Sequence, residues 1–331
     1  MKNQRWQELD CARALSMLWI VGVYHLRGYT SVSLSPSVTR MFEVLTLVAL
    51  ATFTFLSAFF LGNKKFFHFH EVWSFYKRRL LRIYPLFLAS CVTLYCLGMI
   101  GGGVKYFTSP KQFLLTLVGL GCFVTPAPKT VWYVSMLLFF YLLTPFVLYH
   151  FTLSWKVVLV RLVGGSAIFL LIYALDDAKL LSVDGRFFRH FVIYFGVLLL
   201  ASALQRLVAS PRGRFGVLFG VPVLASALWF PDGCESALVI SLLGIAFFCG
   251  LGKCLVECKP ISIVSSWIGF GSMVAYLFHR QFFAVFVKCF GIFSPLLAAI
   301  LLILLIVISY YCQVCYDFLL RRISNTKRIS S

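Results

Sequence analysis

The chain has 331 residues, of which 61% are hydrophobic and only 12% are charged. Soluble domains are roughly half apolar and about a quarter charged, so this composition excludes an ordinary soluble protein and indicates an integral membrane protein. The net charge is +19, from 30 Lys and Arg residues against 11 Asp and Glu residues. A nucleic-acid-binding protein would gather this charge on a polar domain, and the sequence has none. Basic cytoplasmic loops explain most of the excess, and no nucleic-acid partner is expected.

Ten apolar runs are long enough to cross a membrane, which takes roughly 20 mostly apolar residues. They are 9–28, 39–62, 84–101, 131–151, 157–175, 189–206, 214–230, 236–253, 261–287 and 293–317. An eleventh run, 112–126, is short and bounded by prolines. If it crossed, the basic loop at 205–214 would lie outside, whereas ten crossings with both termini inside keep the basic loops cytoplasmic. We therefore predict an all-α, polytopic transmembrane bundle of about ten helices, forming a single domain over residues 1–331.

The eleven cysteines do not predict a metal site. Most lie inside apolar runs, and the pairs Cys254/Cys258 and Cys312/Cys315 have neither a second pair nor a histidine nearby. Buried small apolar side chains are the expected role, so we expect no metal.

A group of arginines lies between the second and third apolar runs. Arg79 and Arg82, at positions i and i+3, fall on one face of a helix, and Arg78 lies four residues before Arg82. The planar guanidinium binds two phosphate oxygens at once, which suits an anionic carrier. The alternative is a juxtamembrane basic patch that binds anionic lipid headgroups. The spacing alone does not separate the two interpretations.

Two histidines lie within apolar helices. His25 is far along the first run, and a neutral imidazole can accept a proton near pH 7. A buried histidine with one satisfied hydrogen bond is the structural alternative. His279 and Arg280 form a second polar pair in a late apolar helix, where packing alone is a poor explanation. The other histidines are interpreted as bystanders in loops or at interfaces: His68, His70, His150 and His190.

Two carboxylates are candidates to pair with nearby basic side chains or with His25. Glu43 is the one acidic residue well placed on the expected outer side of the bundle, where it could orient His25 as the acid of a triad does. It could equally pair with Arg40 at the membrane interface. Asp10 and Arg13, at i and i+3 on the first helix, could form an intrahelical ion pair.

Several short motifs occur in a definite order along the chain. They are Leu9-Asp10-x-x-Arg13 with His25, the aromatic run Phe53–Leu61, Arg78-Arg79-x-x-Arg82-x-x-Pro85, Trp132-Tyr133 with Tyr141 and Pro145, and Tyr276-x-x-His279. In this order, and with ten helices, they resemble the acyltransferase-3 family from residue 5 to about 285. Its members are integral-membrane bacterial acyltransferases that act on O-antigen, nodulation factors, exopolysaccharide and peptidoglycan.

The resemblance implies an acyl-CoA donor, with acetyl-CoA the favoured form, and a hydroxyl of a cell-surface or lipid-linked glycan as acceptor. It places the donor phosphates near Arg79 and Arg82, with Arg78 beside them, and the acyl thioester near His25. Membrane lipids surround the chain, and the bacterial inner membrane is the implied location.

The family pattern and this sequence differ in helix one. The family usually places ten residues between its basic residue and its histidine, whereas eleven separate Arg13 from His25. One extra residue turns a side chain by about 100° on a regular helix, so we expect a π-bulge to restore the direction of His25. The usual Ser-Gly after the aromatic run is Ser57-Ala58 here.

On this interpretation the protein is a membrane O-acyltransferase in which His25 acts as general base. An acyl-histidine intermediate is the second mechanism considered. Asp10 and Arg13 would brace helix one and are candidates to contact the donor. The acceptor end would be lined by Trp132, Tyr133, His279 and Arg280.

The alternative class is a non-enzymatic transporter or flippase of a lipid-linked sugar or anion. Such a protein could use the same group of arginines to bind its anionic cargo, but it would not need a thioester. The sequence does not specify the sugar, the hydroxyl or the oligomeric state.

Overall fold

The computed structural model describes residues 6–100, 106–152, 154–229 and 234–329. Within these ranges every regular element is a helix, and extended pairing is limited to two isolated bridges, Thr30 with Phe293 and Phe66 with Tyr149. The predicted all-α class is confirmed. The chain forms two compact units: the first comprises Met1–Leu56 and Leu207–Ser331, and the second comprises Ser57–Arg206. Each unit is described by itself.

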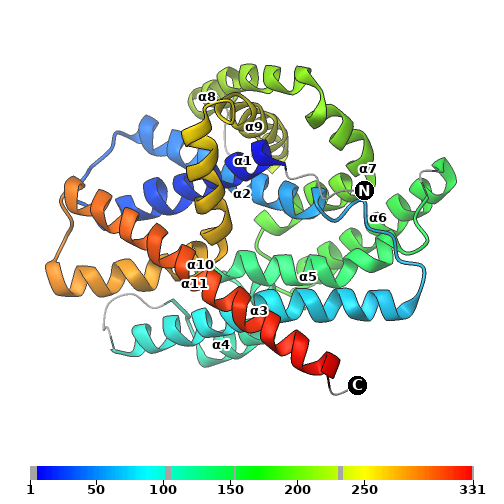
Figure 1. The fold of residues 1–331 in the computed structure, drawn as a ribbon, viewed down its shortest axis with the longest axis horizontal. Helices are drawn as coiled ribbons and strands as arrows, with labels where there is room; N and C mark the ends of the chain where they lie inside the picture. Colours follow the sequence, from blue (N-terminus) through cyan, green and yellow to red (C-terminus); the bar gives the residue numbers. More distant parts are fainter. Residues whose placement is uncertain (1–5, 101–105, 153, 230–233, 330–331) are drawn as a thin grey trace. The chain divides into compact units, whose positions relative to one another are not determined.

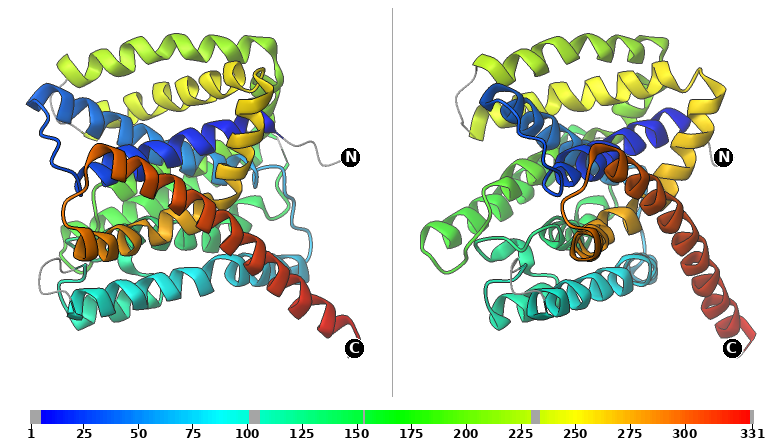
Figure 2. Two further views of the ribbon diagram at one scale, coloured as in Figure 1. Left: turned by 60° about the vertical axis from the view of Figure 1, so that its left-hand side comes forward. Right: turned by 90° about the vertical axis from the view of Figure 1, so that its left-hand side faces the viewer.

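The first unit contains the two ends of the chain. Its helical elements are α1 (Gln7–Met17), the π-helix η1 (Leu18–His25), most of α2 (Pro36–Phe59), the 3-10 helix η3 (Pro211–Phe219), α8 (Gly220–Trp229), α9 (Cys234–Leu255), α10 (Lys259–Phe290) and α11 (Pro295–Ile329) (Figure 1). α1 packs against both α9 and α10, and α10 packs against α11. In both views of Figure 2 the C-terminal turns of α11 extend away from α1, α9 and α10.

The second unit contains the middle of the chain. Its elements are α3 (Phe69–Ile100), α4 (Pro110–Leu117), the 3-10 helix η2 (Gly121–Phe123), α5 (Val131–Leu148), α6 (Trp155–Asp177) and almost all of α7 (Arg186–Ala209). α3, α4 and η2 all pack against α5. The interior beside α5 and α7 is aromatic, with Phe140, Phe187 and Tyr194 fully buried.

Eight of the described helices are long and apolar enough to cross a membrane: α2, α3, α5, α6, α7, α9, α10 and α11. The chain is therefore a multi-pass membrane protein. The other two predicted spans are 9–28 and 214–230, of which residue 230 lies outside the described residues. Over their described residues both are mainly helical, but each changes helix type along its length. The first passes from α1 into η1 at Leu18, and the second from η3 into α8 at Gly220. An apolar run predicts a helix but does not reveal such a change of winding.

The eleventh apolar run forms a short folded segment. α4 has only 8 residues and η2 only 3, so neither can span a bilayer. The buried side chain of Gln112 fastens the segment, because its Oε1 accepts from the Thr108 hydroxyl at 3.0 Å and its Nε2 donates to the Pro126 carbonyl. This agrees with the expectation that 112–126 does not cross.

The position of α1 depends on two glycines. Gly252 of α9 lies so close that an added Cβ would overlap the carbonyl oxygen of Glu8, and a Cβ on Gly269 of α10 would lie 3.2 Å from the carbonyl oxygen of Asp10. Small residues of this kind let membrane helices approach closely. The first turns of α1 are therefore fixed between α9 and α10.

Replacing Gly252 with alanine should destabilise the protein by about 1–3 kcal/mol, because α1 would have to move out of a tightly packed position. The matched control is Gly164→Ala on α6, where nothing lies within 4 Å of the added Cβ. Thermal unfolding of the purified protein in detergent measures both. Equal unfolding midpoints for the two variants would contradict this account of the packing.

Candidate active site

His25 and His279 stack directly on each other in the first unit. Their ring centroids are 4.7 Å apart and their planes differ by 5°. His25 is the last residue of η1, and His279 lies on α10 with no exposed surface. The sequence named both residues separately, and the structure brings their rings into contact.

The π-helical winding of η1 brings His25 to this position. η1 runs for eight residues, Leu18–His25, and α1 leads into it with helical backbone at Leu18. A π-turn contains more residues than an α-turn, so it absorbs the extra residue between Arg13 and His25. The predicted π-bulge is confirmed.

Hydrogen bonding indicates the protonation pattern of His279. Its Nδ1 lies 2.8 Å from the carbonyl oxygen of Tyr276. A carbonyl oxygen only accepts, so Nδ1 donates, and in the neutral ring Nε2 then carries a lone pair. His279 Nε2 and His25 Nδ1 are both buried, and neither has a hydrogen-bond partner among the described residues. Parallel rings cannot hydrogen-bond to each other through in-plane nitrogens.

Each unsatisfied buried nitrogen costs about 1–3 kcal/mol. Two such atoms in one stack point to a site that accepts a polar group from a bound molecule. Aromatic rings surround it, with Tyr24 5.3 Å from His25, and Tyr276 and Phe283 6.0 Å and 6.3 Å from His279, all between centroids. Arg280 follows His279 and is partly exposed.

Glu43 is not the partner of His25. It is exposed on α2 and forms no hydrogen bond with the histidine. The face of α2 that meets η1 instead carries Phe42 and Thr46: Trp19 packs on Phe42 at 5.1 Å and donates from Nε1 to Thr46 Oγ1 at 3.1 Å. Glu43 follows Phe42 by one residue, which turns it about 100° from that face. Among the described residues Glu43 therefore makes no contact with His25 that would support the triad-like interpretation.

Asp10 and Arg13 form the intrahelical pair that their spacing allowed. Arg13 Nη1 lies 3.4 Å from Asp10 Oδ1, and both side chains are mostly buried, with 27% and 19% of their surfaces exposed. The pair begins at Asp10, whose carbonyl oxygen faces Gly269 of α10, so it belongs to the part of α1 that packs closely against its neighbours.

The three arginines of α3, in the second unit, differ in environment. Arg79 is partly buried, with its guanidinium carbon 5.2 Å from the centroid of Tyr141 and 5.8 Å from that of Phe75. Arg78 and Arg82 are exposed. Within the part of the chain that the structure describes, none of the three forms an ion pair with an acidic side chain. The cluster therefore has uncompensated positive charge.

Lys64 joins this cluster from the α2–α3 loop. Its Nζ lies 5.6 Å from the centroid of Phe75, the same ring that Arg79 contacts. Partial burial, together with the charges of Arg79 and Arg78, lowers the pKa of Lys64. Sequence reasoning missed Lys64, because a loop residue fourteen positions before Arg78 has no helical spacing that relates the two.

Trp132 and Tyr133 at the start of α5 are almost completely buried. Both contact His190 of α7, whose ring centroid is 6.0 Å from that of Trp132 and 5.7 Å from that of Tyr133. Arg186 lies over Trp132 at 4.1 Å. His190 has no exposed surface, so it packs in the interior of the second unit. The i, i+4 spacing of Arg186 and His190 is the sequence pattern that could have indicated that the two side chains share one face of a helix.

Asp184 positions Arg186. The Arg186 guanidinium donates from Nε to Oδ1 at 2.7 Å and from Nη2 to Oδ2 at 2.5 Å. Burial tends to raise the pKa of Asp184, but the hydrogen bonds and charge of Arg186, with Arg189, lower it overall. The carboxylate therefore stays charged and holds the arginine over the tryptophan.

These helices define a polytopic membrane protein, and its first unit contains a stacked histidine pair among aromatic side chains. The family model described as acyltransferase domain, of the acyltransferase-3 type, matches residues 6–314. The chain belongs to this family and is a membrane acyltransferase. No curated protein and no solved structure matches it. Among the described residues no group of three or more His, Cys, Asp or Glu side chains could hold a metal ion.

Because the pKa of Lys64 is lowered, its amine should be neutral, and so react with amine-directed reagents, at a lower pH than an ordinary lysine. Removing Arg79 in Arg79→Met should raise this pKa, so that modification of Lys64 by an amine-reactive ester reaches half its maximal rate at a higher pH than in the wild type. Lys129→Met, which removes a charge just before the start of α5, twelve residues before Tyr141, serves as control. Mass spectrometry across a pH series measures the rates, and an unchanged midpoint in Arg79→Met would contradict the assigned cause.

Proposed function

We propose that the protein transfers an acyl group, favouring acetyl, from acyl-CoA to a hydroxyl of a cell-surface or lipid-linked glycan, with His25 as general base. The observation that carries this proposal is the His25–His279 stack with its two unsatisfied buried nitrogens. A base for acyl transfer must have a free nitrogen lone pair within reach of a hydroxyl, and the stack offers one inside an apolar helix bundle.

The steps follow from general-base chemistry. An imidazole nitrogen of His25 takes the proton of the acceptor hydroxyl as its oxygen attacks the thioester carbonyl. The carbon–sulfur bond then breaks, CoA leaves as the thiolate, and the imidazolium returns the proton to sulfur. The products are an ester and free CoA.

His279 acts in this proposal as a positioning residue. The parallel stack holds the plane of the His25 ring, and the Tyr276 carbonyl holds His279 in turn. Two positive rings at 4.7 Å beside Arg280 would repel each other strongly in an apolar site, so one ring carries the proton at a time.

The remaining roles are assigned by family pattern and charge. Arg79 and Arg82, with Arg78, are proposed to bind the donor phosphates, and Asp10 with Arg13 to brace α1 near the donor. Trp132, Tyr133 and Arg280 are proposed to line the acceptor end. The single domain of the proposal spans residues 1–331, since the family match extends across both units.

The transporter or flippase alternative is less favoured, because the family match indicates acyl transfer and the histidine pair supplies a base that transport does not need. Release of free CoA in step with acceptor modification distinguishes the two classes. Burst release of CoA without acceptor would favour the acyl-histidine mechanism over direct transfer.

We propose a bacterial inner-membrane location with both termini cytoplasmic, since this keeps the basic segments at 63–82, 205–214 and 253–260 inside. An epitope inserted after Lys129 should be accessible on intact spheroplasts, whereas one at the C-terminus should require lysis. Antibody labelling before and after lysis measures this. Accessibility of the Lys129 epitope only after lysis would overturn the orientation.

Replacing His25 with alanine should lower acyl transfer by about 10²–10⁴-fold, the usual contribution of a general base. Donor binding and the thermal unfolding midpoint should remain close to wild type, because the base acts on the acceptor proton. CoA release with purified protein and acceptor measures the rate, with His68→Ala as matched control. A His25→Ala enzyme that turns over at the wild-type rate would refute the proposed base.

A further inference from the structure

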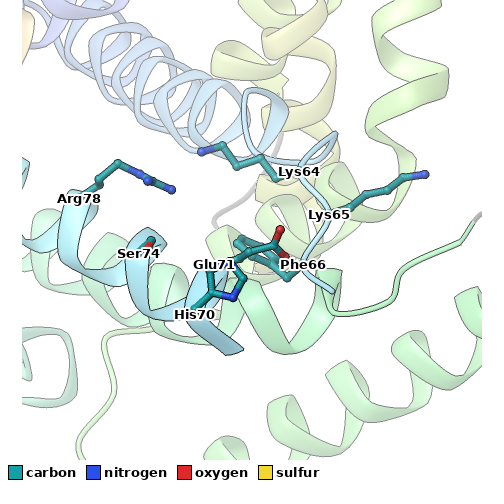
Figure 3. Close-up of a pocket in the computed structure, with 7 residues that line it drawn as sticks. All are labelled: Lys64, Lys65, Phe66, His70, Glu71, Ser74 and Arg78. Atoms are coloured by element: carbon teal, nitrogen blue, oxygen red, sulfur yellow. The ribbon is translucent and has the colours of Figure 1, made fainter. Parts of the chain in front are cut away.

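A cavity of about 350 Å³ opens beside the N-terminal end of α3 in the second unit. Its polar lining consists of Lys64, Lys65, His70, Glu71, Ser74 and Arg78, with Phe66 beside them (Figure 3). Most of the side chains that can carry charge here are cationic. The sequence selected only Arg78 from this set.

Lys64 and Arg78 face each other across this cavity. Figure 3 shows their charged ends pointing toward one another, with Ser74 near Arg78, whereas Lys65 extends away. Two cations directed at one space repel each other. An anion between them would convert that repulsion into two charge-assisted contacts.

The carboxylate in the cavity does not serve as that anion. Glu71 Oε2 accepts hydrogen bonds from the backbone N–H groups of Phe67, at 2.7 Å, and His68, at 3.2 Å. Glu71 is thereby committed to the start of α3, where a carboxylate also interacts favourably with the helix dipole. Lys64 and Arg78 have no acidic partner among the described residues.

We infer that this cavity binds a phosphomonoester dianion between Lys64 and Arg78. The inference rests on the proposed function, in which the donor is acyl-CoA, and it assigns to this cavity the 3′-phosphate of the donor's nucleotide. Lys64 is then a specificity-determining residue that separates CoA from dephospho-CoA.

Charge favours a monoester over a lipid phosphodiester. A phosphomonoester carries roughly −1.5 to −2 charges near pH 7, whereas a phosphodiester carries a single charge, so two facing cations match the former better. The pKa of Lys64, lowered by burial and by Arg79 and Arg78, is consistent with a lysine that gains from a bound anion. Ser74 adds a hydroxyl donor to the same space.

The test compares binding of CoA and dephospho-CoA to the purified full-length protein in nanodiscs of zwitterionic lipid. Wild type should bind CoA about tenfold more tightly than dephospho-CoA, and Lys64→Met should lose this preference by weakening CoA alone about tenfold. Lys77→Met is the matched control, because it removes the same charge from an exposed side chain of α3 that does not line the cavity; it should keep the preference. Equal unfolding midpoints establish that each variant is folded.

The possible failures are distinct. If wild type binds CoA but binds dephospho-CoA equally well, or if Lys64→Met weakens both ligands alike, the phosphomonoester site is refuted and the proposed acyltransferase stands. If wild type binds neither ligand, both the proposal of an acyl-CoA donor and the proposal of this phosphate site are refuted. If Lys64→Met changes only the binding of anionic lipid added to the nanodiscs, the cavity is a headgroup site and the inference is wrong.

Discussion

The candidate active site depends on a single change of helical winding. An α-helix continued from Arg13 would point His25 about 100° away from its present direction, whereas the π-helical segment Leu18–His25 brings its ring onto His279. π-turns are rare and are found frequently at functional sites. Here the winding places a histidine in contact with a second histidine that lies 254 residues later in the chain.

Packing and hydrogen bonding make that placement rigid. The close approach at Gly252 and Gly269 fixes the first turns of α1, and the bond from His279 Nδ1 to the Tyr276 carbonyl fixes the partner ring. Buried imidazole nitrogens without partners are unfavourable in an apolar bundle. On the proposed function the fold retains them because the same nitrogens would handle a proton of the substrate.

Periodicity and motif order predicted the helical class and the helical segments, and they singled out the two histidines whose rings the structure brings into contact. The eleven-residue spacing even predicted the π-bulge, because helix geometry converts one extra residue into a known rotation. Three features could not be predicted. The direction of Glu43 depends on which face of α2 meets Trp19; Lys64 reaches Arg78 from a loop; and the burial of His190 depends on how α5 and α7 pack. Each is a tertiary contact with no counterpart in local spacing.

The central claim is that the stack of His279 on His25 orients the base for acyl transfer. Comparing acyl-transfer rates of His279→Phe and His279→Ala tests it most directly, because phenylalanine keeps a flat ring but carries no nitrogen. The account predicts that His279→Phe retains more than about a tenth of the wild-type rate and that His279→Ala falls by about 10²-fold or more. Equal rates for the two variants, whether both high or both low, would contradict a positioning role for the ring.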